Sequence, residues 1–466
     1  MQSVPRLVIG APHGRSGKTT ITMGLLAAFR SEKGLSVQPF KKGPDFIDPG
    51  WLSLVAGRDC RNLDIFLMGP DNVAASFLAH SAGVDLALVE GAMGLYDGVD
   101  LRGSGSTAEI ARIIKAPVVL VVDCTRLTRS VAAMVMGFQH FDPETNIAGV
   151  ILNRVARSRH EKMLRAALCE YCGVPVLGAV PKGENFFIPD RHLGLVPAAE
   201  SDALAEKISG IGRAAARYLD LDEIWKIARQ APVLKGRGIS WGCAAGPGKV
   251  KVGVFRDRSF TFYYPENLEA LYACGAEVVA VDALNDPGLP EVDALYLGGG
   301  FPEVFAAGLE ANAGLRRDVK EAVEKGMPVY AECGGLIYLG RELNWEGRSY
   351  RMAGALPFDV VLTEKPQGHG YEVFQVTGEN PFFPVGATIK AHEFHHSRVI
   401  NLDREKVRFA FRVVRGWGVD GKYDGLVYKN VLAAYAHVHA LAVPDWARWL
   451  AEKAARQKAA AAPGRG

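Results

Sequence analysis

The sequence predicts an α/β protein of two domains, each built on a largely parallel sheet with helices on both faces. Short apolar runs alternate with amphipathic segments twice along the chain, the pattern typical of parallel sheets with crossover helices. The length of 466 residues exceeds that of a usual single domain, and 48% apolar residues supply two packed cores. The expected divisions are a first domain at 1–228, a linker at 229–249, a second domain at 250–450 and a flexible tail at 451–466.

Four buried strands are expected in the first half of the chain. They read RLVIGA (6–11), DLALVEG (85–91), PVVLVVD (117–123) and IAGVILN (147–153). The stretch TTITMGLLAAFRSE (19–32) between them has helical periodicity.

The second half begins after a stretch rich in Gly, Pro and Ala, which predicts a linker. Four further strands are expected, at KVKVGVF (249–255), AEVVAVD (276–282), ALYLGGG (294–300) and PVYAEC (328–333). The last residues are small and charged, which indicates a fraying tail.

Charge and cysteine content limit the class of protein. A net charge of +3 is too small to indicate a nucleic-acid partner, but it suits a polyanionic small substrate. Seven scattered cysteines predict a reducing, cytoplasmic setting, and the isolated pair Cys169 and Cys172 is interpreted as packing. We expect no signal peptide, and no apolar run is long enough to predict a membrane span.

The N-terminal stretch APHGRSGKTT (11–20) predicts a P-loop that binds ATP. It lies between a strand and a helix, where backbone N–H groups and the helix N-terminus hold phosphate oxygens. Gly14 and Gly17 permit the turn, Lys18 neutralises phosphate charge, and Thr19, followed by Thr20, offers a hydroxyl to Mg²⁺.

The P-loop departs from the common pattern at one position and from the partition-type signature at two others. Pro12 stands where the pattern has its first Gly. His13 occupies the place of the signature lysine of partition-type ATPases, and Arg15 replaces a second Gly of that signature. These differences argue against a nucleotide-sandwich dimer of that class.

Two acidic segments are expected beside the P-loop. PFKKGPDFIDPGW (39–51) supplies Lys41, Asp45 and Asp48, and LALVEGAMGLYDG (86–98) ends a buried strand at Glu90, with Asp97 seven residues later. Carboxylates at the carboxyl ends of strands near a P-loop hold Mg²⁺ directly or through water. A helix cap or a solvated loop is the alternative for Asp48 and Asp97.

Thiol chemistry is predicted at VYAECGGLIYLG (329–340). A strand, a cysteine, two glycines and a helix form a nucleophile elbow, which exposes Cys333 at a helix N-terminus where the thiolate is favoured. The loop LGGGFPE (297–303) follows the preceding strand and is a candidate second donor to an oxyanion. A buried structural cysteine is the alternative.

A nucleophilic cysteine needs a base, and two histidine groups are candidates. His437 and His439 follow one apolar run, and His392, His395 and His396 lie in another segment. Spacing alone does not choose between them. A zinc site is a rival use of these histidines, but their spacing matches no usual closed site.

Taken together, these motifs resemble the cobyrinate a,c-diamide synthases, over about residues 5 to 450. The most specific matches are PFKKGPDFIDP, VEGAMGLYDG, IPDRHLGL (188–195), LGGGFPE, AECGGLIYL and HEFHHSR. The resemblance implies an N-terminal domain similar to dethiobiotin synthetase and a C-terminal class I glutamine amidotransferase-like domain.

The resemblance also implies roles for single residues. Cys333 matches the glutaminase nucleophile, and the late Y-x-H segment of the family matches AYAH, which points to His437 as its base. Ordinary class I amidotransferases have an acidic residue two positions later, where this chain has His439. The orientation of His437 is therefore an open question at this point.

At the phosphate end, the resemblance implies an ATP and Mg²⁺ site with acidic residues beside the transferred phosphate. The matching residues of the ATP and Mg²⁺ site are Lys18, Thr19, Asp45 and Glu90. Asp48 and Asp97 match the residues held near the transferred phosphate and the substrate carboxylate, and Phe46 and Ile47 are candidates for contact with the substrate.

The implied activity is ATP- and glutamine-dependent amidation of the a and c acetate carboxylates of cobyrinate through acyl phosphates. The alternative substrates are sirohydrochlorin, its nickel complex and sirohaem, and the stretch KPQGHGYEVFQVTGENPFFPVG (365–386) favours these. A four-fold amidating cobyric acid synthase is disfavoured, since its members carry an Asn-rich segment in place of GPDFIDP. A regulatory P-loop protein with an inactive amidotransferase domain is the alternative of a different class. The expected partners are a tetrapyrrole polycarboxylate and L-glutamine, without nucleic acid or membrane, and a homodimer stays open.

Overall fold

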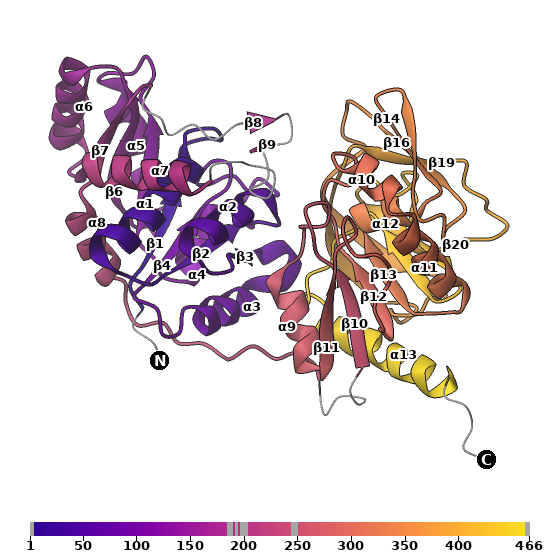
Figure 1. Ribbon diagram of the computed structural model, residues 1–466. Helices are drawn as coiled ribbons and strands as arrows, with labels where there is room; N and C mark the ends of the chain where they lie inside the picture. The colour runs from indigo at the N-terminus through magenta and orange to yellow at the C-terminus, as the bar shows by residue number, and fades with distance from the viewer. Residues whose placement is uncertain (1–3, 184–189, 192–193, 196–203, 244–249, 462–466) are drawn as a thin grey trace. The chain divides into compact units, whose positions relative to one another are not determined.

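The computed structural model describes residues 4–183, 190–191, 194–195, 204–243 and 250–461. The chain forms two compact units, Met1–Ile239 and Ser240–Gly466, each with its own sheet and core (Figure 1). The division between them falls inside the stretch where the sequence indicated a linker. Both units are α/β, which confirms the predicted fold class.

The described part of the first unit contains a seven-stranded sheet in the order β3-β2-β4-β1-β5-β6-β7, and every neighbouring pair is parallel. A short two-stranded ribbon, β8 with β9, lies apart from it. The strands are β1 (Arg6–Gly10), β2 (Val37–Lys42), β3 (Arg61–Leu63), β4 (Leu86–Glu90), β5 (Val118–Asp123), β6 (Ile147–Val155), β7 (Val176–Pro181), β8 (Asp190–Arg191) and β9 (Gly194–Leu195).

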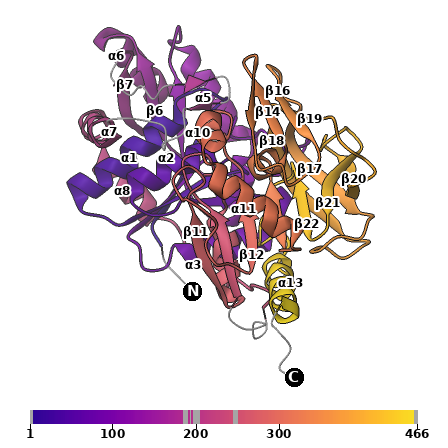
Figure 2. The same cartoon turned by 45° about the vertical axis from the view of Figure 1, so that its right-hand side comes forward.

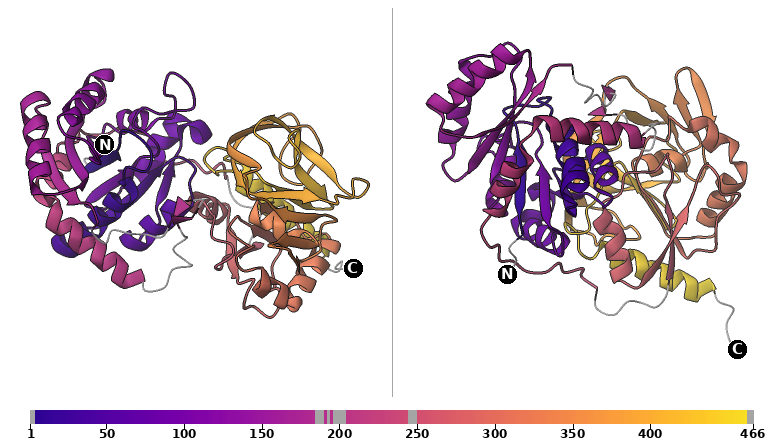
Figure 3. Two further views of the ribbon diagram at one scale, coloured as in Figure 1. Left: turned by 90° about the horizontal axis from the view of Figure 1, so that it is seen from above. Right: turned by 60° about the vertical axis from the view of Figure 1, so that its left-hand side comes forward.

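Helices cover both faces of this sheet (Figure 3). The crossover from β1 leads to β2 on one side, whereas the crossover from β4 leads to β5 on the other, so right-handed connections place α1 and α4 on opposite faces. The helices are α1 (Lys18–Lys33), α2 (Ile47–Ala56), α3 (Ile65–His80), α4 (Thr107–Ile113), α5 (Ser130–Phe141), α6 (Ser158–Tyr171), α7 (Leu204–Tyr218) and α8 (Leu221–Arg229).

The core of the first unit fixes α1 above the central strands. Leu7 and Ile9 of β1 point into one apolar cluster with Leu25 and Phe29 of α1. Gly24 of α1 lies where an added Cβ would be 2.8 Å from the Cβ of Ala215 in α7, so the two helices approach closely. This packing holds the N-terminus of α1 at the carboxyl end of β1.

The second unit contains, among its described residues, a nine-stranded sheet in the order β11-β10-β12-β13-β22-β21-β20-β17-β18 (Figure 2). The pairs from β11 to β22 are parallel and those from β22 to β18 are antiparallel. Its strands are β10 (Val250–Phe255), β11 (Ala276–Val281), β12 (Ala294–Leu297), β13 (Val329–Glu332), β17 (Gly368–Val376), β18 (Thr388–His395), β20 (Arg408–Arg415), β21 (Tyr423–Tyr428) and β22 (Val431–Ala434).

A smaller sheet and five helices complete the described part of this unit. The smaller sheet has the order β15-β14-β16-β19 and consists of β14 (Glu342–Trp345), β15 (Arg348–Arg351), β16 (Asp359–Leu362) and β19 (Ser397–Ile400). The helices are α9 (Pro265–Ala273), α10 (Ala306–Ala311), α11 (Ala313–Glu324), α12 (Gly334–Leu339) and α13 (Trp446–Ala461).

The C-terminal segment corrects one expectation. A flexible tail was expected from residue 451, but the chain up to Ala461 belongs to α13. Leu450, Ala451 and Ala454 of this helix are buried in the core beside β10 and β12. Alanine favours helix and fits a narrow interface, so a run that is poor in large apolar residues still packs.

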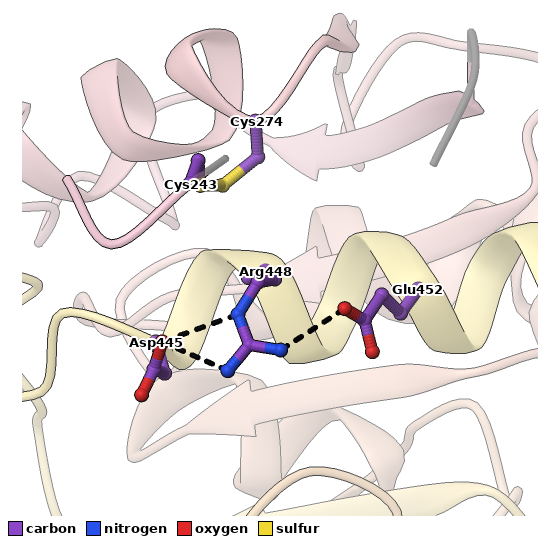
Figure 4. The surroundings of a disulfide bond; sticks show 5 residues. All are labelled: Cys243, Cys274, Asp445, Arg448 and Glu452. Atoms are coloured by element: carbon purple, nitrogen blue, oxygen red, sulfur yellow. Dashed lines mark hydrogen bonds and ion pairs between the residues drawn. A yellow bond between two sulfur atoms is a disulfide. The ribbon is translucent and has the colours of Figure 1, made fainter. Parts of the chain in front are cut away.

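A disulfide joins Cys243 to Cys274, a pair that the cysteine pattern did not predict (Figure 4). The two residues are 31 positions apart, and only the fold brings the segment before β10 to the end of α9. Nearby, Arg448 at the start of α13 donates to Asp445 and Glu452. Within the described residues, no helix has the length and hydropathy needed to cross a bilayer.

Candidate functional sites

The predicted P-loop lies between β1 and α1. Gly17 is the N-terminal cap of α1 and has a φ of 94°, and a Cβ there would lie 2.2 Å from Nδ2 of Asn153. The same Asn153 amide donates to the Ser16 carbonyl at 2.9 Å. Glycine is therefore required at position 17, and Asn153 of β6 is a positioning residue that the sequence analysis missed.

Lys18 connects the P-loop to the loop after β4. Its Nζ donates to the carbonyls of Met93 at 2.7 Å and His13 at 3.2 Å. Burial, followed by the charge of Lys41, lowers the pKa of Lys18 to about 8. A phosphate group beside this ammonium would raise the pKa of Lys18 again.

The register of three neighbouring strands brings the acidic segments to the P-loop. Glu90, at the carboxyl end of β4, pairs with Lys41 of β2 on one side and with Ile9 of β1 on the other. Asn62 of β3 donates to the carbonyls of Gly43 and Asp45, both at 2.7 Å, and so holds the loop after β2. The sequence analysis also missed Asn62, because no motif marks it.

Lys41 lies at the centre of a buried charge cluster. Its Nζ is 2.5 Å from Oδ2 of Asp48, 2.8 Å from Oε1 of Glu90 and 3.8 Å from Oδ2 of Asp45. Thr19 donates its hydroxyl to Glu90 Oε1 at 2.6 Å. The structure thus brings together Thr19, Lys41, Asp45, Asp48 and Glu90, which the sequence had assigned to one site.

Burial and the lysine charge compete in setting the pKa values of this cluster. Burial and the neighbouring Asp48 raise the pKa of Asp45 to about 7, and burial also raises that of Glu90. Burial opposes ionisation of Asp48 too, but its short contact with Lys41 lowers its pKa. As the pH rises, Asp48 therefore loses its proton before Asp45 does.

Asp97 is not part of this cluster. Its Oδ2 accepts the Gly94 amide at 2.8 Å in the loop after β4, and its side chain is exposed. Its charge still raises the pKa of Lys18, so it lies near the P-loop lysine. Gly14 is partly buried in the P-loop, and Thr20 is partly buried in the first turn of α1.

The second site forms at the carboxyl ends of β12, β13 and β22, which are neighbouring parallel strands. Cys333 directly follows β13, and His437 comes three residues after the end of β22. Since Glu332 pairs in register with Ala434, the segment that begins at Cys333 and the segment that leads to His437 leave the sheet side by side. The loop from Gly298 to Glu303 follows β12 at the same edge.

Cys333 occupies the predicted elbow. It is the N-terminal cap of α12, with φ 45° and ψ −95°, a conformation that L-residues rarely adopt. Gly335 donates to the Gly298 carbonyl at 3.0 Å, and a Cβ on Gly334 would lie 3.0 Å from the Gly300 nitrogen. The amides of Gly334 and Gly300 are therefore candidate oxyanion donors beside the sulfur.

The expectation of a helix-stabilised thiolate is corrected by the environment of Cys333. Burial, together with the charges of Glu303 and Glu332, raises the pKa of Cys333 above its ordinary value. The six residues of α12 supply too small a dipole to offset that desolvation. The resting group is the thiol, so a base must accept its proton.

His437 presents its two ring nitrogens to different groups. Its Nδ1 lies 3.7 Å from Oε2 of Glu332. A Cβ on Gly299 would lie 3.3 Å from Nε2 and 2.5 Å from Cε1, so that edge of the ring faces the glycine loop beside Cys333. His437 and His392 exchange backbone hydrogen bonds, at 2.7 and 3.1 Å.

The other histidines have different surroundings. His395 stacks on Tyr435 with ring centroids 3.6 Å apart and lies 3.6 Å from Glu393. His439 lies 3.7 Å from Glu266. The contacts with Glu332 and the glycine loop thus distinguish His437, a choice that spacing alone had left open.

Two minor expectations concern metals and cysteines. Among the described residues, no group of three or more His, Cys, Asp or Glu side chains is arranged to hold a metal ion. Cys172 donates its thiol to the Ala132 carbonyl, and both it and Cys169 are free cysteines. The segment IPDRHLGL lies partly outside the described residues.

Two family models match the two halves of the chain. Residues 7–196 match the family described as CobQ/CobB/MinD/ParA nucleotide binding domain, and residues 251–444 match the CobB/CobQ-like glutamine amidotransferase domain. The first match covers the P-loop and its acidic cluster, and the second covers Cys333 and His437. The chain therefore combines a nucleotide-binding domain with a glutamine amidotransferase domain.

Three relatives that match nearly the whole chain carry the same name. Cobyrinate a,c-diamide synthase of Magnetococcus marinus is 48% identical over 453 residues, 96% of this chain and 97% of the relative. The proteins of that name from Archaeoglobus fulgidus and Methanosarcina acetivorans are 43% and 40% identical, over 98% and 99% of this chain and 98% and 97% of theirs. With this similarity over nearly its whole length, the chain belongs to the cobyrinate a,c-diamide synthase family.

Proposed function

We propose that this protein amidates the a and c acetate carboxylates of cobyrinate, with ATP to activate each carboxylate and glutamine as the nitrogen donor. The observation that supports this most directly is the presence in one chain of a P-loop with an acidic cluster and of a cysteine elbow with a facing histidine. Full-length relatives of the same name support the choice of substrate.

The glutaminase half releases ammonia by covalent catalysis. His437 accepts the proton of Cys333, and the sulfur attacks the side-chain carbonyl carbon of glutamine. The amides of Gly334 and Gly300 hold the oxyanion, and the carbon–nitrogen bond breaks as His437 returns a proton to the leaving ammonia. Water then hydrolyses the γ-glutamyl thioester and releases glutamate.

The synthetase half makes the carboxylate reactive. A carboxylate resists attack by ammonia, because its leaving group would be oxide. In the proposed reaction, a carboxylate oxygen attacks the γ-phosphorus of ATP, and ADP leaves. Ammonia attacks the carbonyl carbon of the acyl phosphate, and phosphate leaves. Lys18 neutralises phosphate charge, and Asp48 and Asp97 lie near the lysines that hold it.

The acidic cluster suits Mg²⁺. The oxygen donors Thr19, Asp45, Asp48 and Glu90 are hard ligands, and Glu90 Oε2 is buried without a hydrogen-bond partner. One or two protein carboxylates suffice, since Mg²⁺ keeps several waters and phosphate oxygens as ligands. The chemistry that a bound Mg²⁺ supplies is neutralisation of the negative charge that develops on the phosphates.

Other tetrapyrroles are the second candidate substrates. The stretch 365–386, which favoured sirohydrochlorin and sirohaem in the sequence, contributes Phe374, Phe382 and Phe383 to the hydrophobic core of the second unit. These aromatic residues therefore have a structural role that does not depend on the macrocycle. The names of the relatives favour cobyrinate.

A mass-spectrometric assay tests the proposal. The purified chain receives ATP, Mg²⁺ and glutamine with cobyrinate, sirohydrochlorin, nickel-sirohydrochlorin or sirohaem in separate reactions. We expect a diamide from cobyrinate, and a diamide from another macrocycle alone would move the assignment to that substrate.

The Cys333→Ala variant tests the thiol in the same assay. It should lose glutamine-dependent amidation by at least about 10³-fold and retain amidation with an ammonium salt, because only the ammonia source is removed. Cys169→Ala is the matched control and should retain both reactions. Normal use of glutamine by Cys333→Ala would contradict the assignment of the nucleophile.

A further inference from the structure

The described part of the second unit holds three buried Glu–His pairs of similar geometry. Glu332 lies 3.7 Å from His437, Glu266 lies 3.7 Å from His439, and Glu393 lies 3.6 Å from His395. The Glu–His distance therefore does not show which pair takes part in the glutaminase reaction. The position of each pair relative to Cys333 distinguishes them.

Glu332 is tied to the elbow by the chain itself. It is the last residue of β13 and directly precedes Cys333, and its register partner on β22 is Ala434. Glu332 and His437 each have only 2% of their side chains exposed. Any displacement of this carboxylate would therefore disturb the nucleophile and the histidine together.

Hydrogen bonds fix the Glu332 carboxylate on both oxygens. Oε1 accepts the Val438 amide at 2.9 Å and the Tyr330 hydroxyl at 3.1 Å. Oε2 accepts the Tyr296 hydroxyl at 2.9 Å and is the oxygen that faces His437. Because Val438 follows His437 directly, its amide also locks the histidine backbone against the carboxylate.

The two edges of the His437 ring have separate partners. Nδ1 faces Glu332, whereas the Nε2 edge faces Gly299, and a Cβ on Gly334 would lie 3.3 Å from the carbonyl carbon of the same Gly299. One nitrogen thus meets a carboxylate, and the other faces the corner that carries Cys333. A base that takes a thiol proton at Nε2 must carry its own proton on Nδ1, and a carboxylate at Nδ1 holds that tautomer and stabilises the imidazolium.

We propose that Glu332 is the positioning residue of the glutaminase, which holds His437 with its proton on Nδ1 and stabilises the imidazolium formed when Nε2 takes the proton of Cys333. This inference rests on the proposed glutaminase reaction. It also accounts for His439, which stands where a carboxylate is usual and is paired with Glu266 instead. The carboxylate of the site comes from the strand before the nucleophile.

The test uses Glu332→Gln in the full-length chain, with Glu266→Gln as the matched control. The control removes the same charge from a buried Glu–His pair of the same length. We expect Glu332→Gln to lower kcat for glutamine hydrolysis by about 10²–10⁴-fold with little change in KM. We expect Glu266→Gln to stay within about threefold of the wild type in kcat.

Partial rescue by a second carboxylate separates positioning from folding. Glu332→Asp keeps the charge on a shorter arm, so it should recover part of the kcat that Glu332→Gln loses, with little change in KM. Thermal midpoints of all variants show whether each is folded.

Ammonium-dependent amidation distinguishes this inference from the proposed function. Glu332→Gln should keep it, and its absence in the wild type as well would count against the function rather than against Glu332. A wild-type kcat in Glu332→Gln, or equal losses in Glu332→Gln and Glu266→Gln, would overturn the inference. If Glu332→Gln does not fold, a wild-type kcat in Glu332→Asp would overturn it.

Discussion

At the scale of single residues, Lys18 links burial to nucleotide binding. Its pKa is lowered to about 8, chiefly by burial, and the phosphates of a nucleotide would raise it again. Binding should therefore take up a proton above pH 8. The charge of Lys18 contributes fully to the free energy of ATP binding below pH 8. This contribution is lost as the pH rises through the pKa that Lys18 has in the bound form.

We predict that the Kd for ATP rises by up to about tenfold per pH unit between pH 8 and 10, where the phosphates are already ionised. Calorimetric titrations in two buffers of different ionisation enthalpy measure the proton uptake directly. Lys429→Gln, which removes a partly exposed lysine of the second unit, serves as the control and should show the same uptake as the wild type. A Kd that is independent of pH over this range would contradict the assignment of Lys18.

Cys333 shows which properties of a single residue can be predicted from the sequence and which cannot. Its place at a strand–helix corner was predictable, because an apolar run ends directly before a cysteine and two glycines, the pattern of a nucleophile elbow. Its raised pKa was not predictable, because the charges of Glu303 and Glu332 reach it only through the fold. The pairing of Glu332 with His437 also depends on the register of β13 with β22, which no local motif encodes.

At the scale of elements, the corner between β13 and α12 combines strain with close packing. Cys333 has a positive φ, and a Cβ on Gly335 would lie 2.4 Å from the Leu297 carbonyl oxygen. The parallel core strands around this corner restrict its relaxation. The strain is therefore retained in the folded protein and is compensated by packing elsewhere.

We predict that Cys333→Gly is more stable than Cys333→Ala by about 1–2 kcal/mol, since glycine adopts this φ without a Cβ penalty. Denaturant unfolding of the two variants measures the difference. Glu321, in the last turn of α11, provides the control, where alanine should be more stable than glycine by up to about 1 kcal/mol. Equal stability of the two Cys333 variants would show that the corner carries no backbone strain.

Eight of the parallel strands were predicted as elements, whereas β2, β3, β7 and the antiparallel half of the second sheet were not. The expected runs coincide with β1, β4, β5, β6, β10, β11, β12 and β13. Most of these strands are buried and therefore nearly continuously apolar, whereas β11 lies at the sheet edge and is only partly buried. β17 mixes glycine, polar and apolar residues and has the buried Glu372 at a position where an apolar residue would be expected. The alternation of apolar and polar residues that indicates a strand is therefore hidden. β21 and β22 are joined at Lys429 and Asn430, which are not the usual glycine-containing turn pair.

At the scale of the whole molecule, each unit carries its own hydrophobic core and its own candidate site. The cluster around β1 and α1 belongs to Met1–Ile239, and the clusters around β12 and β13 belong to Ser240–Gly466. Units with separate cores usually unfold in separate transitions. We therefore expect two calorimetric transitions.

We predict that a non-hydrolysable ATP analogue raises only the transition of the first unit. At 100 times its Kd, the analogue should stabilise that unit by about 2.7 kcal/mol, which corresponds to a rise of about 5–10 °C in Tm for a domain of this size. The Cys333→Gly and Cys333→Ala variants assign the other transition, because their difference in stability belongs to the second unit.

Glutamine should stabilise the second unit instead, and the Cys333→Ala chain allows this to be measured because it binds glutamine without hydrolysing it. It should raise the transition of the second unit and leave the first in place, because its carbonyl group would lie between the amides of Gly334 and Gly300. A single transition that moves with either ligand would mean that the two cores unfold as one cooperative unit. In that case the two units would share one free energy of unfolding. Substitutions at Cys333 would then also weaken nucleotide binding near the thermal midpoint.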